Sequence, residues 1–152
     1  MSNDQRKLKK KLEKAGALVS VNKAGEVKAI QFVGKRTEDK HLELLPEATE
    51  LEKLIISYTN ITDDGLVHLS SLKKLRILSL FRNSIGDAGM VHLEQLTALE
   101  QLNLEETGLS DRGIPKLCNL KNLERISMDH ESVSQKGEDM LREAIPECQI
   151  YR

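Results

Sequence analysis

Several residue types are scarce or missing. The chain of 152 residues has no tryptophan, only 3% aromatic residues and two cysteines, Cys118 and Cys148. Two cysteines are too few for a disulfide framework and show no metal-ligand spacing, so we interpret both as reduced, small apolar side chains. No apolar run approaches the roughly 20 residues that cross a bilayer, and the N-terminus lacks the apolar segment of a signal peptide. The net charge of −1 gives no overall preference for nucleic acid. We therefore expect a soluble, cytoplasmic protein.

Leucine, by contrast, returns at a fixed interval. The stretch 51–74 has an apolar skeleton that recurs twice, each time 24 residues later. The matching positions are Leu51, Leu54, Ile56, Ile61, Gly65, Leu66, Leu69 and Leu72, then Leu75, Leu78, Leu80, Ile85, Gly89, Met90, Leu93 and Leu96, then Leu99, Leu102, Leu104, Leu109, Gly113, Ile114, Leu117 and Leu120. A fixed internal period in this range is typical of a stacked solenoid.

Each repeat has two parts with different periodicities. The first part alternates apolar and other residues, which predicts a short strand, and the second has leucines three apart, which predicts a helical segment. Neighbouring strands lie about 4.8 Å apart whereas packed helices need roughly 8–10 Å, so the stack must curve with its strands inside. The pattern therefore predicts an α/β solenoid with a concave parallel sheet and convex helices. Asp63, Asp87 and Asp111 are predicted helix N-caps.

The same residues carry a family resemblance. The run Leu-x-x-Leu-x-Leu-x-x-Thr/Asn-x-Leu/Ile, followed by Asp-x-Gly-Leu-x-x-Leu, resembles the leucine-rich-repeat family. The Thr-Asp-Asp-Gly-Leu form is most similar to bacterial repeats of 24 residues and to the ribonuclease-inhibitor-like group. This resemblance implies a right-handed horseshoe used for protein recognition. The ninth repeat position is Thr59, Asn83, Thr107 and Glu131, so we do not expect a continuous asparagine ladder.

We expect a single domain, 1–152, that is complete at both ends. Residues 1–26 form an N-terminal helix and hairpin, 27–146 hold five repeats with degenerate first and last members, and 147–152 form a closing strand. The predicted helix, 2–16, is capped by Asp4, and the predicted hairpin pairs 18–21 with 27–32. His41 replaces the recurring glycine in the first repeat, which predicts a different turn there. Glu138 replaces a core residue in the last repeat, as a terminal unit tolerates.

Catalytic motifs are missing from the sequence. It contains no Gly-x-Gly-x-x-Gly, no phosphate-binding loop and no Gly-x-Ser-x-Gly. His68 and His92 share a repeat position, but helices 8–10 Å apart would hold them too far apart for a zinc ion. Glycines that recur with the repeat, such as Gly65 and Gly89, are interpreted as structural turn residues. We therefore predict a non-enzymatic protein with no cofactor, metal or small-molecule substrate.

The predicted binding site is the concave face, where side chains between the core leucines point away from the core. Ile55, Tyr58, Ile77 and Phe81 are expected to cluster as apolar anchors, and Glu105, Glu106 and Asp129 to select a basic feature of a protein partner. The whole predicted face consists of Lys53, Ile55, Tyr58, Ile77, Phe81, Arg82, Gln101, Asn103, Glu105, Glu106, Arg125 and Asp129.

Two alternatives remain at this stage. The basic segment from Arg6 to Lys14 suggests a contact with nucleic acid or an anionic membrane, although Asp4 and Glu13 dilute its charge and no large aromatic residue anchors it. The other alternative is a structural or assembly subunit that self-associates through Ile55 and Phe81, which would make a homo-oligomer.

Overall fold

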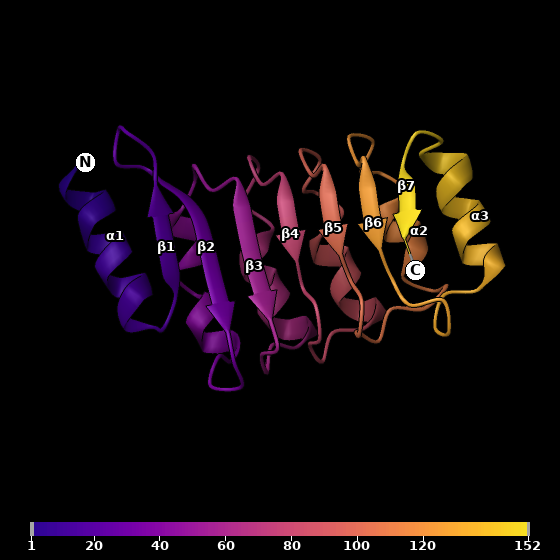
Figure 1. The fold of residues 1–152 in the computed structure, drawn as a ribbon, viewed down its shortest axis with the longest axis horizontal. Coiled ribbons are helices and arrows are strands. Elements are labelled where there is room, and N and C mark those ends of the chain that lie inside the picture. The colour runs from indigo at the N-terminus through magenta and orange to yellow at the C-terminus, as the bar shows by residue number, and fades with distance from the viewer. Residues whose placement is uncertain (1, 152) are drawn as a thin grey trace.

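The computed structural model describes residues 2–151, in which seven strands form one sheet in chain order (Figure 1). The strands are β1 (Leu18–Val21), β2 (Val27–Val33), β3 (Lys53–Ser57), β4 (Ile77–Ser79), β5 (Gln101–Asn103), β6 (Arg125–Ser127) and β7 (Gln149–Tyr151). The first two strands are antiparallel and the others pair in parallel. The predicted hairpin and closing strand are therefore present, although Met1 and Arg152 lie outside the described residues.

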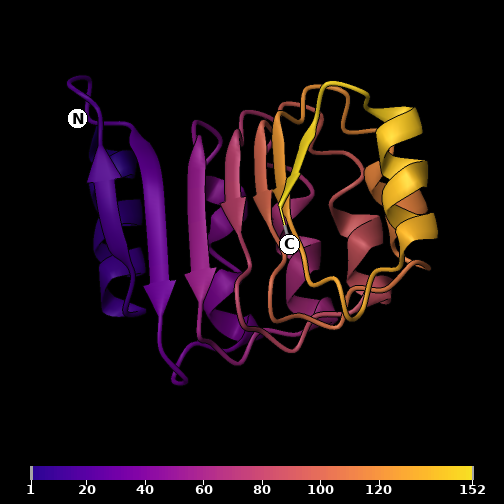
Figure 2. The same ribbon diagram turned by 45° about the vertical axis from the view of Figure 1, so that its right-hand side comes forward.

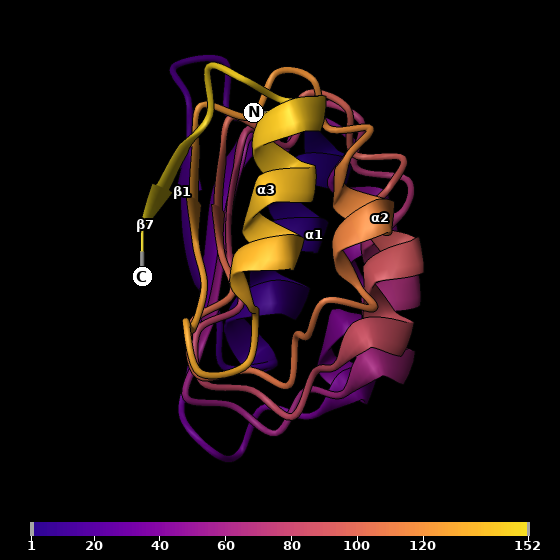
Figure 3. The same cartoon turned by 90° about the vertical axis from the view of Figure 1, so that its right-hand side faces the viewer.

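The helices form a second layer on one side of this sheet (Figure 3). They are α1 (Asn3–Lys14), α2 (Ile114–Leu117) and α3 (Gln135–Ala144), with the 3₁₀ helices η1 (Asp39–Leu42), η2 (Leu45–Glu47), η3 (Asp63–Leu69) and η4 (Asp87–His92). Most repeats thus use the tighter 3₁₀ form, in keeping with the glycine and β-branched valine inside η3 and η4. No helix within residues 2–151 is both long and apolar enough to cross a membrane.

The strand register reproduces the sequence period. Leu54, Leu78 and Leu102 stand side by side on β3, β4 and β5. These leucines and their counterparts in the helical segments are almost completely buried and form one continuous core between the layers. The α/β leucine-rich-repeat solenoid predicted from the sequence is therefore confirmed, with its sheet open on the side opposite the helices (Figure 2).

The recurring aspartates do not cap their own helices, contrary to the prediction. Asp63 Oδ1 accepts the backbone N–H of Gly86 (2.7 Å), and Asp87 accepts both the backbone N–H (2.7 Å) and the hydroxyl (2.6 Å) of Ser110. Each carboxylate thus binds the turn of the next repeat, one period along the chain. Asp111 makes the same contacts to Ser134, and these hydrogen bonds lower the pKa of its carboxyl.

The recurring glycines make room for these aspartates. A Cβ at Gly89 would lie 2.5 Å from Asp63 Oδ1, and one at Gly113 would lie 2.7 Å from Asp87 Oδ1. Neither glycine has a positive φ, so the constraint is space and not backbone conformation. His41 occupies the matching place in the first repeat, where its Nδ1 accepts the Glu38 N–H (2.9 Å). The predicted difference in that turn is confirmed.

The two ends of the stack differ from its middle. Ser2, and not Asp4 as predicted, caps α1 by accepting the Gln5 N–H (3.2 Å). The helix directs Leu8 and Leu12 into the core. At the other end Glu138 is buried, as its position predicts, and its Oε1 accepts a hydrogen bond from Arg142 Nη2 (2.6 Å).

Candidate functional site

The open face of the sheet carries four rows of side chains that cross the strands. Register and repeat spacing align Lys53, Ile77, Gln101 and Arg125 in the first row, Ile55, Ser79, Asn103, Ser127 and Tyr151 in the second, Ser57, Phe81, Glu105 and Asp129 in the third, and Tyr58, Arg82 and Glu106 in the fourth. All twelve residues predicted from the sequence lie in these rows. None of the twelve is fully buried, so the side chains of the rows are available for contact.

Tyr58, Phe81, Arg82 and Glu106 form a connected group, the edge cluster, where the strands end. The Tyr58 and Phe81 rings meet edge to face, with centroids 5.1 Å apart. The Arg82 guanidinium carbon lies 5.2 Å from the Tyr58 ring centroid, and Arg82 Nε lies 3.2 Å from Glu106 Oε2. The cluster therefore offers an aromatic surface next to an exposed ion pair, a combination suited to contact with another protein.

Three members of the edge cluster have a left-handed backbone. The φ angles are 57° at Tyr58, 56° at Arg82 and 51° at Glu106, a region that is uncommon for residues other than glycine. Gly34 holds the equivalent place after β2 with φ of 101°. Each side chain in this conformation costs of order 1 kcal/mol, and such strain is concentrated at functional sites in known proteins.

The predicted apolar anchors are divided between different parts of the face. Tyr58 and Phe81 touch in the edge cluster, whereas Ile55 lies opposite Ser79 and Ile77 opposite Lys53. Ile55 lines a shallow hollow of about 150 Å³ beside the hairpin, and Ile77 lines one of about 410 Å³ over β4–β7. The face thus has apolar contact points at several places along the strands.

The predicted acidic residues gather where β5 and β6 end. Asp129 Oδ2 accepts the Glu106 N–H (2.8 Å), and the Asn103 side-chain amide donates to Glu105 Oε2 (3.1 Å). Glu106 and Asp129 also line a hollow of about 380 Å³ with His130, Glu131 and Ser132. Asp129 consequently orients the turn that presents Glu106, in addition to adding negative charge to this end of the face.

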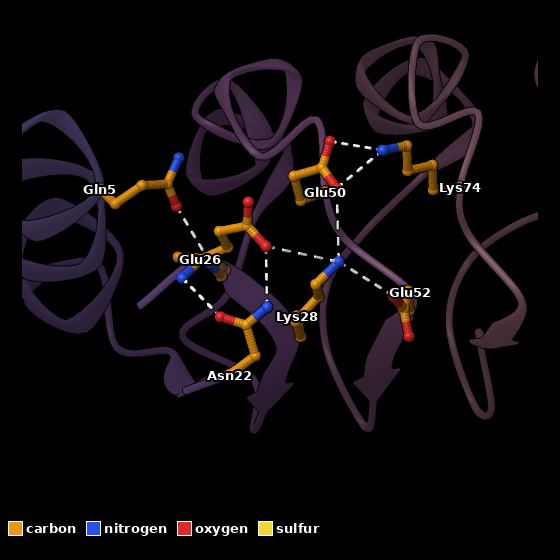
Figure 4. Close-up of polar contacts among 8 residues, drawn as sticks. Gln5, Asn22, Glu26, Lys28, Glu50, Glu52 and Lys74 are labelled. Carbon is orange, nitrogen blue, oxygen red and sulfur yellow. Dashed lines mark hydrogen bonds and ion pairs between the residues drawn. The ribbon is translucent and has the colours of Figure 1, made fainter. Parts of the chain in front are cut away.

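The opposite end of the strands has a larger hollow, of about 560 Å³, and most of its charged lining residues form ion pairs. Arg76 Nε bonds Glu100 Oε1 (2.7 Å) and Lys74 bonds Glu50 (2.6 Å), which lowers the pKa of both carboxyls. Lys28 joins Glu50 and Glu52 in the same ladder (Figure 4). Solvent screening keeps the contribution of exposed pairs of this kind to stability small. These charges already bind one another across repeats.

The histidine, cysteine and acidic side chains do not form a metal site or a reactive thiol in the part of the chain that the structure describes. Within residues 2–151 no three side chains of His, Cys, Asp or Glu gather as a metal site. Cys118 and Cys148 are free thiols, and burial raises the pKa of both. A raised pKa disfavours the reactive thiolate.

The apolar side of the basic helix α1 packs against the core of the protein. Leu8 and Leu12 are buried, so they do not form an apolar face for a membrane. Among its cations, Lys9 lies 3.6 Å from Glu13 and Lys11 lies 3.4 Å from Glu47.

Two large side chains of the open face, Tyr151 and Leu18, were not predicted from the sequence. Tyr151 on β7 and Leu18 on β1 line the hollows around Ile77 and Ile55. Both belong to the terminal strands, which the sequence identified only as covers for the core. Each of the two residues is next to a partly buried residue, Val19 or Ile150, and side chains alternate along a strand. This alternation could have placed both residues on the open face.

Comparisons with known proteins agree with this architecture. The sequence model of the family described as leucine rich repeat matches residues 49–109. No curated protein sequence matches the chain.

Among solved structures, the chain is similar to the tropomodulin C-terminal domain of Caenorhabditis elegans, with 16% identity, a TM-score of 0.65 and coverage of 95% of this chain and 93% of that one. It is also similar to the leucine-rich-repeat ectodomain of the receptor kinase SOBIR1 from Arabidopsis thaliana, with 15% identity, a TM-score of 0.54 and coverage of 99% and 92%. These likenesses concern the fold. Together with the repeat register and the family match over residues 49–109, they show that the chain has the leucine-rich-repeat fold.

Proposed function

We propose that the protein is a non-enzymatic interaction module that binds a protein partner on the open face of its sheet. The observation that supports this most strongly is the edge cluster, in which Tyr58, Arg82 and Glu106 keep their side chains at positions with positive φ. Folding alone would favour glycine there, as at Gly34, so we attribute the retained side chains to recognition.

The distribution of chemistry over the face supports the same function. The apolar side chains of the face, Ile55, Ile77 and Phe81, lie on β3, on β4 and just after β4. Amide and acidic side chains follow on β5 and just after it, at Gln101, Asn103, Glu105 and Glu106. Large apolar residues without a place in the core are a recognised mark of interaction sites. The proposed partner places apolar side chains over β3 and β4 and a basic feature near Glu105 and Glu106.

The test is a double substitution, Ile77→Thr with Phe81→Gln. Burying each original side chain contributes about 2 kcal/mol, so losing both should weaken binding by about 4 kcal/mol, or roughly a thousandfold in Kd. The partner is isolated from native lysate with the wild-type chain, purified, and titrated against both proteins by calorimetry.

The matched control is Val67→Thr with Val91→Thr, which changes two exposed valines of η3 and η4 on the helical side. Kd should stay within about twofold of wild type, because these side chains lie on the other layer. Equal affinity of the Ile77/Phe81 variant and wild type, with both folded by circular dichroism, would rule out binding through this face.

A further inference from the structure

The hollow over β4–β7 contains one cation, Arg125, that pairs with no carboxylate in the part of the chain that the structure describes. Arg125 on β6 is exposed, and within residues 2–151 no carboxylate lies within ion-pair distance of it. The other open-face arginine, Arg82, has Glu106 and the Tyr58 ring as partners. Arg125 is therefore available to an anion brought by another molecule.

The other lining residues add neutral hydrogen-bonding groups around Arg125. Gln101 lies directly beside it on β5, and Ser79, Asn103 and Ser127 occupy the neighbouring row. Tyr151 closes the hollow on β7, where its hydroxyl donates to Gln149 Oε1 (2.8 Å). With a volume of about 410 Å³, the hollow has room for a short side chain.

We infer that this hollow binds a carboxylate side chain, Asp or Glu, of the partner polypeptide, with Arg125 as its ionic partner; this rests on the proposed function. A guanidinium binds a carboxylate through two parallel hydrogen bonds, and the amides and hydroxyls complete its solvation. A single arginine suits a singly charged anion.

A partner bound in this way would carry opposite charges at two places along the strands. Asp129 follows Arg125 by four residues, about 13 Å along an extended chain, so positive and negative ends of the face are well separated. An extended partner segment lying along β6 would place an acidic residue over Arg125 and a basic residue near Glu106 and Asp129, about four residues away.

The test is selection of a phage-displayed library of random 12-residue peptides on the immobilised full chain. Wild type should enrich peptides with Asp or Glu at one fixed position relative to their apolar residues. Two synthetic peptides are then compared, an enriched parent peptide and its variant with the acid replaced by the amide. Wild type should bind the amide peptide at least tenfold more weakly than the parent peptide. The Arg125→Gln variant should bind both peptides with the same affinity. The Arg125→Glu variant should enrich Lys or Arg at the same position.

The control variant is Arg112→Gln, an exposed arginine before α2 and outside the sheet face, which should enrich the same peptides as wild type. Two results would overturn this inference and leave the proposed function standing. In the first, the enriched peptides depend on Ile77 and Phe81 but have no fixed acidic position. In the second, selection on the Arg125→Gln variant enriches the same acidic position as selection on wild type. If no enriched peptide depends on Ile77 and Phe81, the proposed function fails as well.

Discussion

Replacing Gly89 by alanine is expected to destabilise the protein by about 2–4 kcal/mol. The new Cβ would lie 2.5 Å from Asp63 Oδ1 and 2.9 Å from Leu66 Cδ1, so the repeats must separate or the aspartate must move. Overpacking of this kind costs about 1–3 kcal/mol, and a displaced Asp63 leaves the Gly86 N–H without its acceptor at a cost of about 1–3 kcal/mol. Urea unfolding measures the change.

A double-mutant cycle shows whether Gly89 acts through Asp63. Asp63→Ala removes the obstructing carboxylate, so the Asp63→Ala/Gly89→Ala protein should lose at least 1 kcal/mol less stability than the two single changes added together. Gly86→Ala is the matched control, because its Cβ would approach no atom closer than 3.7 Å. Additive losses, or a Gly89→Ala protein as stable as wild type, would contradict the proposed interlock between repeats.

The second large effect is expected at Asn83, which is buried between repeats. Its side-chain amide donates to the carbonyls of Ile56 (2.9 Å) and Leu80 (2.8 Å), and its Oδ1 accepts the hydroxyl of Thr59. Asn83→Ala leaves these buried groups without partners, which should cost about 2–4 kcal/mol in the free energy of unfolding. Chemical denaturation with a constant m-value would measure the loss.

Thr107 provides the control at the same position of the next repeat. Its hydroxyl donates to the Leu104 carbonyl (2.6 Å) and accepts a long hydrogen bond from the Leu109 N–H (3.4 Å). Because this side chain is partly exposed, water can replace the lost contacts, so Thr107→Ala should cost about 0.5–1.5 kcal/mol. A Thr107→Ala protein at least as destabilised as Asn83→Ala would show that the buried amide contacts do not stabilise the stack.

The sequence predicted the strand register well, because core leucines and outward residues alternate without interruption. Leu54, Leu78 and Leu102 line up as the period requires, and the open face follows from the positions between them. The role of Asp63 was predicted wrongly because its donor, Gly86, lies in the next repeat. A local capping rule considers only the residues that follow the aspartate in its own helix.

The edge cluster was only partly predictable from sequence. Tyr58, Arg82 and Glu106 were placed on the face by periodicity, but their left-handed backbone was not expected, because bulky and charged residues disfavour it. The one sign of this conformation in the sequence was Gly34, which holds the equivalent repeat position and is a residue that readily adopts positive φ. The sequence also did not predict that Arg125 pairs with no carboxylate among residues 2–151. That outcome depends on the other ion pairs of the fold, such as the one in which Arg76 binds Glu100.

Methyl NMR on isoleucine- and valine-labelled protein tests the proposed binding face most directly. Ile55 and Ile77 lie on the open face, Ile61 lies in the core, and Val67 and Val91 are exposed on η3 and η4. On titration with the purified partner, the methyl signals of Ile55 and Ile77 should shift or broaden first, while those of Ile61, Val67 and Val91 stay in place. Shifts confined to Val67 and Val91, with Ile55 and Ile77 unchanged at saturation, would place the partner on the helical layer and contradict the account.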